Sequence, residues 1–365
     1  MPELDSSIVI SPRDVSNDNI MEMWLFNTCN FRCGYCGLVA DGSVLDNSQL
    51  ERFRTKEGID HILRFFEKNR PNGKKWCLIL TGGEPLLMPN FGYFLKRVKE
   101  MGDSIAVYSN FSVPLAKLID KADADAIAYM HASIHPDWTI GGLSEDRFFS
   151  NVKEARSLGV PVVVRFVVSP HLIHEMDRLE KRADEVGVTF FPTTLFDPSY
   201  PKAYTDEEKA ALTSKMVGYS SILQIEGGIA VEKTRRCKAA GSLFATRLHM
   251  GGDVTPCIST DGPILGNIYS GELESGNDWN NCFKPDSLCS CDIHFQQALV
   301  EGVDDHQNYQ KILAGKGERL VKTYDEWKLS NGIVTDNAVP AKQGVVTPER
   351  SDLLRKVRKT RLIGN

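Results

Sequence analysis

The stretch that decides the fold reads Met21-Glu-Met-Trp-Leu-Phe26 and then, two residues later, Cys29-Asn-Phe-Arg-Cys33-Gly-Tyr-Cys36. The apolar run predicts a buried strand, and α/β barrels carry their chemistry in the loops that follow such strands. A C-x3-C-x2-C spacing lets one short loop place three thiolates at three corners of an iron–sulfur cube, which leaves one iron open. An open metal position is a place to bind another molecule. The alternatives are a structural zinc knuckle and three unrelated buried thiols.

A second motif supports the iron–sulfur interpretation. Trp76-Cys-Leu-Ile-Leu80 predicts another buried strand and leads directly into Thr81-Gly-Gly-Glu-Pro85. Together the two motifs resemble those of the radical S-adenosylmethionine (SAM) enzymes. The resemblance implies that Cys29, Cys33 and Cys36 bind a 4Fe-4S cluster whose open iron is chelated by the amino and carboxylate groups of SAM. It also implies reductive cleavage of SAM to a 5′-deoxyadenosyl radical, with an electron from a donor such as flavodoxin or ferredoxin.

The resemblance also implies which residues bind the cofactor. Tyr35 is expected beside the adenine, and the loop of Gly82, Gly83, Glu84 and Pro85 is expected against the SAM amino group. Glycines permit close approach of the backbone, and a glutamate can accept a charge-assisted hydrogen bond from an ammonium group. The further cofactor-binding candidates are Ser109, Asn110, Ser133 and Arg165. The alternatives are a strand-end turn for Ser109 and Asn110 and a structural ion pair for Arg165.

The rest of the N-terminal half alternates between two patterns. Strand-like runs recur at 105–108, 126–134, 160–168 and 188–191, and helix-like segments lie at 50–68, 91–101, 113–121, 145–158 and 171–186. This alternation predicts an α/β fold with a parallel sheet, and the resemblance implies a partial (β/α)6 barrel followed by a small cysteine-rich domain. We expect an N-terminal extension (1–20), the barrel (21–228), an auxiliary-cluster domain (229–300) and a C-terminal helical segment with a basic tail (301–365).

Two histidines are candidates for proton transfer. His131 and His135 flank Ser133 at alternate strand positions, so all three side chains point to one face of the predicted strand. An imidazole in the barrel interior could exchange a proton near neutral pH. The alternative for each is an ordinary core or rim histidine.

A second group of cysteines lies late in the chain, at Cys237, Cys257, Cys282, Cys289 and Cys291. Their pattern resembles the auxiliary-cluster domain called twitch or SPASM, which implies one auxiliary 4Fe-4S cluster and leaves one thiol over. Gly251 and Gly252 suit a hairpin turn between strands whose outer ends carry Cys237 and Cys257. Cys282 is either a cluster ligand or a hydrogen-atom donor to a substrate radical, and a zinc site is the alternative for the whole group. Cys77 lies inside a predicted strand and is expected in the core.

Composition narrows the setting. Lys and Arg number 43 against 48 Asp and Glu, a net charge of −5, so no general positive field would gather nucleic acid. The N-terminus has no signal-peptide pattern, and no apolar run reaches the length of a membrane span. We therefore expect a cytoplasmic protein without a nucleic-acid or membrane partner. Thiols stay reduced in that compartment, which favours metal binding over disulfides.

Three functions are consistent with these features. The first is dehydrogenation or epimerisation of a small metabolite, such as a sugar or aminocyclitol, by a radical SAM enzyme. The second is maturation of a ribosomally made peptide or protein; the short segment before Cys29 leaves no room there for a leader-binding domain, which favours the first. The third is a non-catalytic iron–sulfur or zinc scaffold, which the intact Gly-Gly-Glu-Pro motif disfavours.

Overall fold

One ten-stranded sheet organises the molecule. The computed structural model describes residues 10–135, 143–194, 204–218, 229–230, 236–257, 262–283, 288–289, 299–301 and 305–320. The strand order in the sheet is β12-β11-β10-β9-β1-β2-β3-β4-β5-β6. Strands β1 to β6 are parallel, and each pairs with the next along the chain. The predicted α/β partial barrel of six parallel strands is therefore confirmed.

The elements have the following bounds. The barrel strands are β1 (Asn19–Trp24), β2 (Trp76–Thr81), β3 (Ser104–Ser109), β4 (Ile127–Ile134), β5 (Val162–Val168) and β6 (Phe190–Thr194). The helices are α1 (Gly37–Ala40), α2 (Lys56–Lys68), α3 (Phe91–Glu100), α4 (Glu145–Ser157), α5 (Met176–Glu185), α6 (Asp206–Thr213) and α9 (His306–Leu313). The later strands of the large sheet are β9 (Leu243–Arg247), β10 (Asp253–Thr255), β11 (Gly266–Asn267) and β12 (Glu272–Leu273). Two small sheets pair β8 (Arg236–Cys237) with β13 (Asn280–Asn281) and β7 (Ile229–Ala230) with β14 (Leu288–Cys289).

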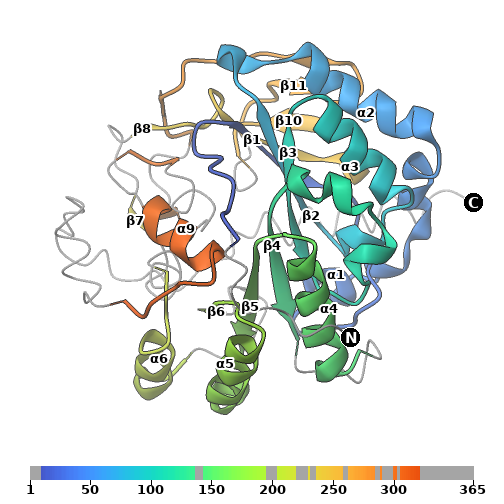
Figure 1. Ribbon diagram of the computed structural model, residues 1–365. Coiled ribbons are helices and arrows are strands. Elements are labelled where there is room, and N and C mark those ends of the chain that lie inside the picture. The colour runs from blue at the N-terminus through green and yellow to red at the C-terminus, as the bar shows by residue number, and fades with distance from the viewer. Residues whose placement is uncertain are drawn as a thin grey trace, which may run out of the picture.

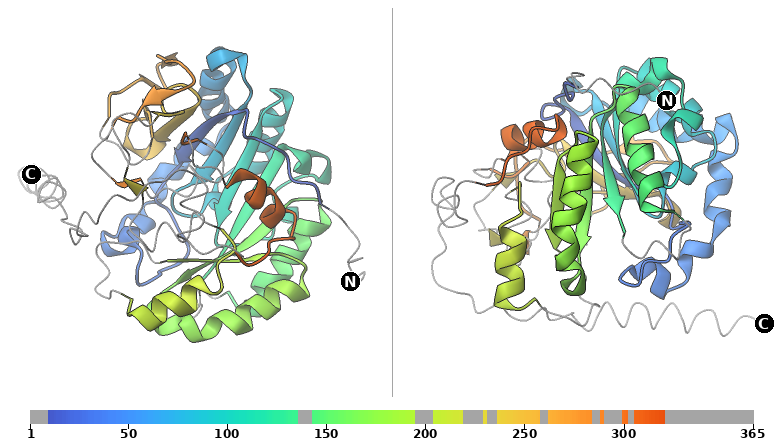
Figure 2. Two further views of the ribbon diagram at one scale, coloured as in Figure 1. Left: turned by 90° about the vertical axis from the view of Figure 1, so that its left-hand side faces the viewer. Right: turned by 60° about the horizontal axis from the view of Figure 1, so that its bottom comes forward.

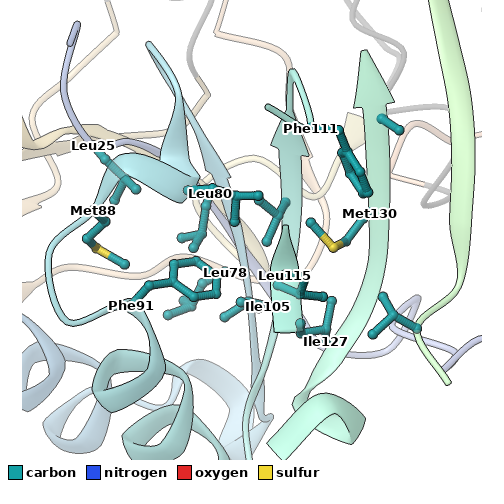
Figure 3. Packing of buried hydrophobic residues seen from close by; sticks show 14 of the residues in the cluster. Leu25, Leu78, Leu80, Met88, Phe91, Ile105, Phe111, Leu115, Ile127 and Met130 are labelled. Atoms are coloured by element: carbon teal, nitrogen blue, oxygen red, sulfur yellow. The ribbon is translucent and has the colours of Figure 1, made fainter. Parts of the chain in front are cut away.

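Helices α2, α3 and α4 cover the outer face of the barrel sheet (Figure 1). Alternate strand residues, such as Leu78, Leu80, Ile105 and Met130, point to this face and pack with Phe91 of α3 (Figure 3). All five of these side chains are buried. This layer between sheet and helices is the main hydrophobic core.

The inner face of the sheet holds a second, smaller core. It is built from the intervening strand residues, among them Ile79, Ala106 and Tyr129, together with Tyr309 and Ile312 of α9. Helix α9 lies across this face, on the side opposite to α2, α3 and α4 (Figures 1 and 2). Cys77 is also here, fully buried, so its predicted place in the core is confirmed.

Three predicted helices differ from those observed. The segment 113–121 forms no α-helix; it contains the 3-10 turn Leu115–Lys117, and a second one, Lys121–Ala126, begins at its end. The chain passes close to α3 here, since a Cβ on Gly92 would lie 2.3 Å from the Leu118 carbonyl oxygen. The predicted helices 50–68 and 171–186 each begin with a 3-10 segment, Asn47–Phe53 and Pro170–Glu175, before α2 and α5.

The sheet continues from the barrel into the later part of the chain. Strand β9 pairs in parallel with β1 and turns back into antiparallel β10. Gly251 and Gly252 have φ angles of 105° and 76°, so the predicted hairpin turn at these glycines is confirmed. Cys237 does not end a hairpin strand, because it lies in β8, which pairs with β13 instead. The domain boundary at 228/229 stays a prediction.

No helix in the described part of the chain is long and apolar enough to cross a bilayer.

Candidate functional site

The first cysteine loop begins where β1 ends at the carboxyl edge of the barrel. Cys29, Cys33 and Cys36 are free thiols, each half-buried. The Cys29 sulfur accepts hydrogen bonds from the Phe31 backbone N–H at 3.4 Å and from Asn110 Nδ2 at 3.8 Å. Burial raises the pKa of Cys29 to about 11, so its thiolate requires a nearby positive charge such as a metal.

The Gly-Gly-Glu-Pro loop packs directly on the backbone that leads into the cysteines. Gly83 N–H donates to the Phe26 carbonyl at 2.7 Å, and Glu84 N–H donates to the Thr28 carbonyl at 2.9 Å. A Cβ on Gly83 would lie 2.0 Å from the Thr28 carbonyl oxygen, and one on Gly82 would lie 2.4 Å from that of Phe26. The two glycines therefore allow the two loops to touch, which is a role that the sequence analysis did not foresee.

Glu84 holds neighbouring loops of the site together through buried hydrogen bonds. Its carboxylate accepts hydrogen bonds from Leu86 N–H at 2.9 Å, Ser109 Oγ at 2.8 Å and Asn110 N–H at 2.6 Å. The side chain is 1% exposed, and burial raises its pKa to about 7. Glu84, Ser109 and Asn110 thus join the loop after β2 to the end of β3, and Asn110 also reaches the Cys29 sulfur. Their predicted contact with SAM stays a prediction.

Tyr35 is held by the end of β4. Its hydroxyl is hydrogen-bonded to His135 Nδ1, and the two rings stack with centroids 6.0 Å apart. Phe31 packs edge-on against the other side of His135, at 5.7 Å between centroids. Burial lowers the pKa of His135 to about 4, so the imidazole is neutral at physiological pH.

A row of partly exposed side chains crosses the inner face at the carboxyl ends of six strands. Strands β9, β1, β2, β3 and β4 each leave one residue partly exposed, and β5 leaves two. We call the six polar or aromatic members the floor: Arg247, Trp24, Thr81, Tyr108, Ser133 and Arg165. Strand register and alternation place them on one face, since Trp24 pairs with both Arg247 and Thr81, and Ser133 pairs with Arg165.

Only Ser133 and Arg165 of the floor were predicted from the sequence. Tyr108 could have been found, because it ends an apolar run just before polar Ser109 and Asn110, whereas Trp24 is followed by apolar Leu25 and Phe26. Arg247 carries no such signal, because its place depends on the pairing of β9 with β1.

His131 lies beneath the floor and is 1% exposed. Its Nε2 is hydrogen-bonded to the Tyr309 hydroxyl of α9, and Tyr108 stacks on its ring at 4.2 Å between centroids. Burial and then the charge of Arg165, whose guanidinium is 3.4 Å from Nδ1, lower its pKa. The structure therefore gives His131 the surroundings of a neutral core residue, and its proton-transfer role stays a prediction.

The later cysteines gather in part. Cys282 lies beside Cys237, and this neighbour, burial and the nearby Cys257 raise the pKa of Cys237. Cys282 therefore lies near Cys237, and its role as a cluster ligand or as a hydrogen-atom donor stays a prediction. Cys289 is described only through its backbone pairing with Ile229, and Cys291 lies outside the described residues.

The two cysteine groups can be compared with the thiolate arrangements that a zinc ion and a 4Fe-4S cluster require. Among the described residues, no three His, Cys, Asp or Glu side chains are grouped so that they could share one metal ion. A 4Fe-4S cube receives its thiolates on different irons, so the thiols of the first loop need not converge on one point, and the zinc alternative for either cysteine group stays open. Partly exposed thiols that accept N–H···S bonds fit such a cube at the first loop.

The fold and the loop define a class: a parallel partial barrel with a three-cysteine loop at the carboxyl end of its first strand. Residues 25–183 match the radical SAM superfamily. The chain therefore contains a radical SAM domain, which confirms the family resemblance of the two motifs.

Curated relatives are distant. The chain is 24% identical to pre-heme d1 synthase of Dinoroseobacter shibae over 176 residues, which are 46% of this chain and 41% of that protein. It is 22% identical to GTP 3′,8-cyclase of Helicobacter pylori over 257 residues, which are 63% of this chain and 77% of that one. The match to the first relative thus spans less than half of its length.

Similar solved structures include native anSMEcpe with bound AdoMet, at a TM-score of 0.48 and 15% identity over 68% of this chain and 78% of that one. Another is Streptococcus suis SuiB bound to S-adenosylmethionine, at a TM-score of 0.44 and 16% identity over 71% of this chain and 63% of that one.

Proposed function

We propose that this protein is a radical SAM oxidoreductase that removes a hydrogen atom from a small metabolite bound over the floor, giving dehydrogenation or epimerisation. One observation carries the proposal: the three-cysteine loop rests on the Gly-Gly-Glu-Pro loop beside a partly exposed polar floor. When bound, the 4Fe-4S cluster and SAM would supply the 5′-deoxyadenosyl radical. The auxiliary cluster of the later cysteines belongs to this proposal.

The protein's own residues would then bind the cluster and SAM, orient the substrate and shield it from water. Cys29, Cys33 and Cys36 would hold the cluster, and Tyr35, fixed by His135, would lie beside the adenine. The floor would hold the substrate with its target C–H bond turned towards the loop, because hydrogen transfer requires close approach of the reacting atoms. Helix α9 closes the inner face below Tyr108 through the contact of Tyr309 with His131. This closure keeps water from reaching the floor from beneath.

The test is formation of 5′-deoxyadenosine. The reconstituted, reduced protein should make it from SAM, and Cys33→Ala should abolish it because the cluster loses one of its three thiolate ligands. Cys77→Ala, which changes a core thiol, is the matched control and should keep the activity. Equal product from Cys33→Ala would contradict the proposal. A precursor peptide encoded beside this gene can be added to the same assay. If the protein modifies it, the substrate is a peptide instead of a metabolite.

A further inference from the structure

The floor contains two positive charges, Arg165 and Arg247, and no carboxylate. Arg247 ends β9 and is paired in register with Trp24 of β1. Its guanidinium lies 5.7 Å from the centroid of the Trp24 ring. Among the described residues, no carboxylate forms an ion pair with it. A cation over an aromatic ring is attracted to the ring, but its charge is not neutralised.

The surroundings of Arg247 keep this corner of the floor positive. His249 lies beside Trp24, with ring centroids 6.0 Å apart, and burial followed by the charges of Arg247 and Arg52 lowers its pKa. The imidazole is therefore neutral and offers no negative charge. Glu22 is the nearest acidic residue on the same face of β1, but it lies one alternation deeper and is 8% exposed.

Arg247 and Arg165 serve different ends of the floor. Strands β1 to β4 separate β9 from β5. Neighbouring strands are about 4.8 Å apart, so the two arginines are about 24 Å apart along the curve of the sheet. The two arginines therefore lie at opposite ends of the floor. If Arg165 serves the cofactor, Arg247 is left to bind another group.

We infer that Arg247 binds an anionic group of the substrate, either a carboxylate or a phosphate. The inference rests on the proposed function and adds the chemical class of the substrate to it. A guanidinium presents two parallel N–H donors that match both groups. Trp24 fixes the place, because its Nε1 donates to Asn27 Oδ1 at 2.9 Å and Asn27 immediately precedes the cysteine loop. An anion on Arg247 would thus be anchored next to the loop that would hold the cluster.

The test is calorimetric titration of the reconstituted full-length protein with two probes, malonate for carboxylates and pyrophosphate for phosphates, at one low ionic strength. We expect the wild type to bind at least one probe, with and without saturating SAM, and the stronger probe identifies the anionic group. Arg247→Gln should raise the Kd about tenfold or more, and Arg247→Lys should raise it less, because it keeps the charge but loses the paired donors. Arg236→Gln is the matched control, since Arg236 is exposed and ion-paired with Glu301.

Thermal melting of each variant establishes that it is folded. The inference is overturned if neither probe binds the wild type, if Arg247→Gln binds like the wild type, if Arg236→Gln weakens binding equally, or if SAM displaces the probe. Probe binding does not require SAM cleavage. If the wild-type protein binds neither probe but still makes 5′-deoxyadenosine, only this inference is overturned. If it binds a probe through Arg247 but makes no 5′-deoxyadenosine, only the proposed function is overturned.

Discussion

Glu84 is the residue on which the site depends most. Its carboxylate satisfies three buried donors, from Leu86, Ser109 and Asn110. We expect Glu84→Ala to lower the free energy of unfolding by about 3 kcal/mol, because all three donors lose their partner. Glu67→Ala is the control; its side chain is 39% exposed and pairs with Arg97, so the loss should be below about 1 kcal/mol. Chemical denaturation of both variants measures the difference, and equal losses would contradict the bracing role.

The same carboxyl makes stability depend on pH. Burial raises the pKa of Glu84 from 4.5 to about 7, so between these values the folded protein holds a proton that the unfolded chain has released. The contribution of this protonated carboxyl to the free energy of unfolding is fully present below pH 4.5. It falls by about 1.4 kcal/mol per pH unit as the pH rises to about 7. Glu84→Gln cannot titrate, so we expect it to show a flatter decline in unfolding free energy between pH 5 and pH 7. Parallel curves of unfolding free energy against pH for the wild type and Glu84→Gln would mean that the Glu84 carboxyl of the folded protein is ionised throughout this pH range.

The pair Tyr35 and His135 gives a second prediction at this scale. If His135 holds Tyr35 in place for the cofactor, Tyr35→Phe and His135→Phe should each weaken SAM binding about fivefold, and the double variant should be no weaker than either. His135→Asn should recover part of the affinity, because Asn Oδ1 can accept from the phenol. Calorimetry with SAM measures all four variants. Tyr93→Phe, which removes a hydroxyl that donates to Asp60 away from the site, is the control. Additive losses from Tyr35 and His135 would show that the two act separately.

At the scale of elements, the contact between two loops sets the position of the cysteines. A Cβ on Gly83 would lie 2.0 Å from the Thr28 carbonyl oxygen, and its neighbours there are backbone atoms that cannot rotate away. We expect Gly83→Ala to separate the loops and to leave fewer irons per chain after reconstitution. Gly37→Ala, also beside the cysteines, has open space around its Cβ position and should keep its iron. A Gly83→Ala protein with full iron would show that the cluster loop does not depend on this contact.

The sequence predicted elements well where the information was local. The barrel strands and the two motifs follow from apolar runs and fixed spacings, and all six strands were found. The helix predicted at 113–121 is absent because the close passage of the chain beside α3 outweighs the amphipathic pattern. The partners of Tyr35 and His131 could not be predicted, because His135 and Tyr309 reach them from distant parts of the chain. Arg247 was missed for the same reason.

At the scale of the whole molecule, the later part of the chain completes the barrel. Strand β9 covers the open edge of β1, and α9 buries Tyr309 and Ile312 against the inner face. We expect a chain that ends at residue 228 to lose cooperative melting and to aggregate, because β1 becomes an exposed edge and the inner core is opened. A chain that ends at residue 320 keeps every described element and should melt like the full chain. A monomeric shorter chain with the same melting temperature would show that residues 21–228 fold alone.

The two cysteine groups make the last prediction, which concerns iron in the whole chain. Two 4Fe-4S clusters should give about eight irons after anaerobic reconstitution, and changing Cys29, Cys33 and Cys36 together to Ala should leave about four. Because Cys282 lies beside Cys237, we expect Cys282→Ala to lose the other four, whereas Cys77→Ala should keep all eight. Stoichiometric zinc would contradict the auxiliary cluster. Full iron in Cys282→Ala, with solvent hydrogen no longer entering the product, would instead make Cys282 a hydrogen-atom donor.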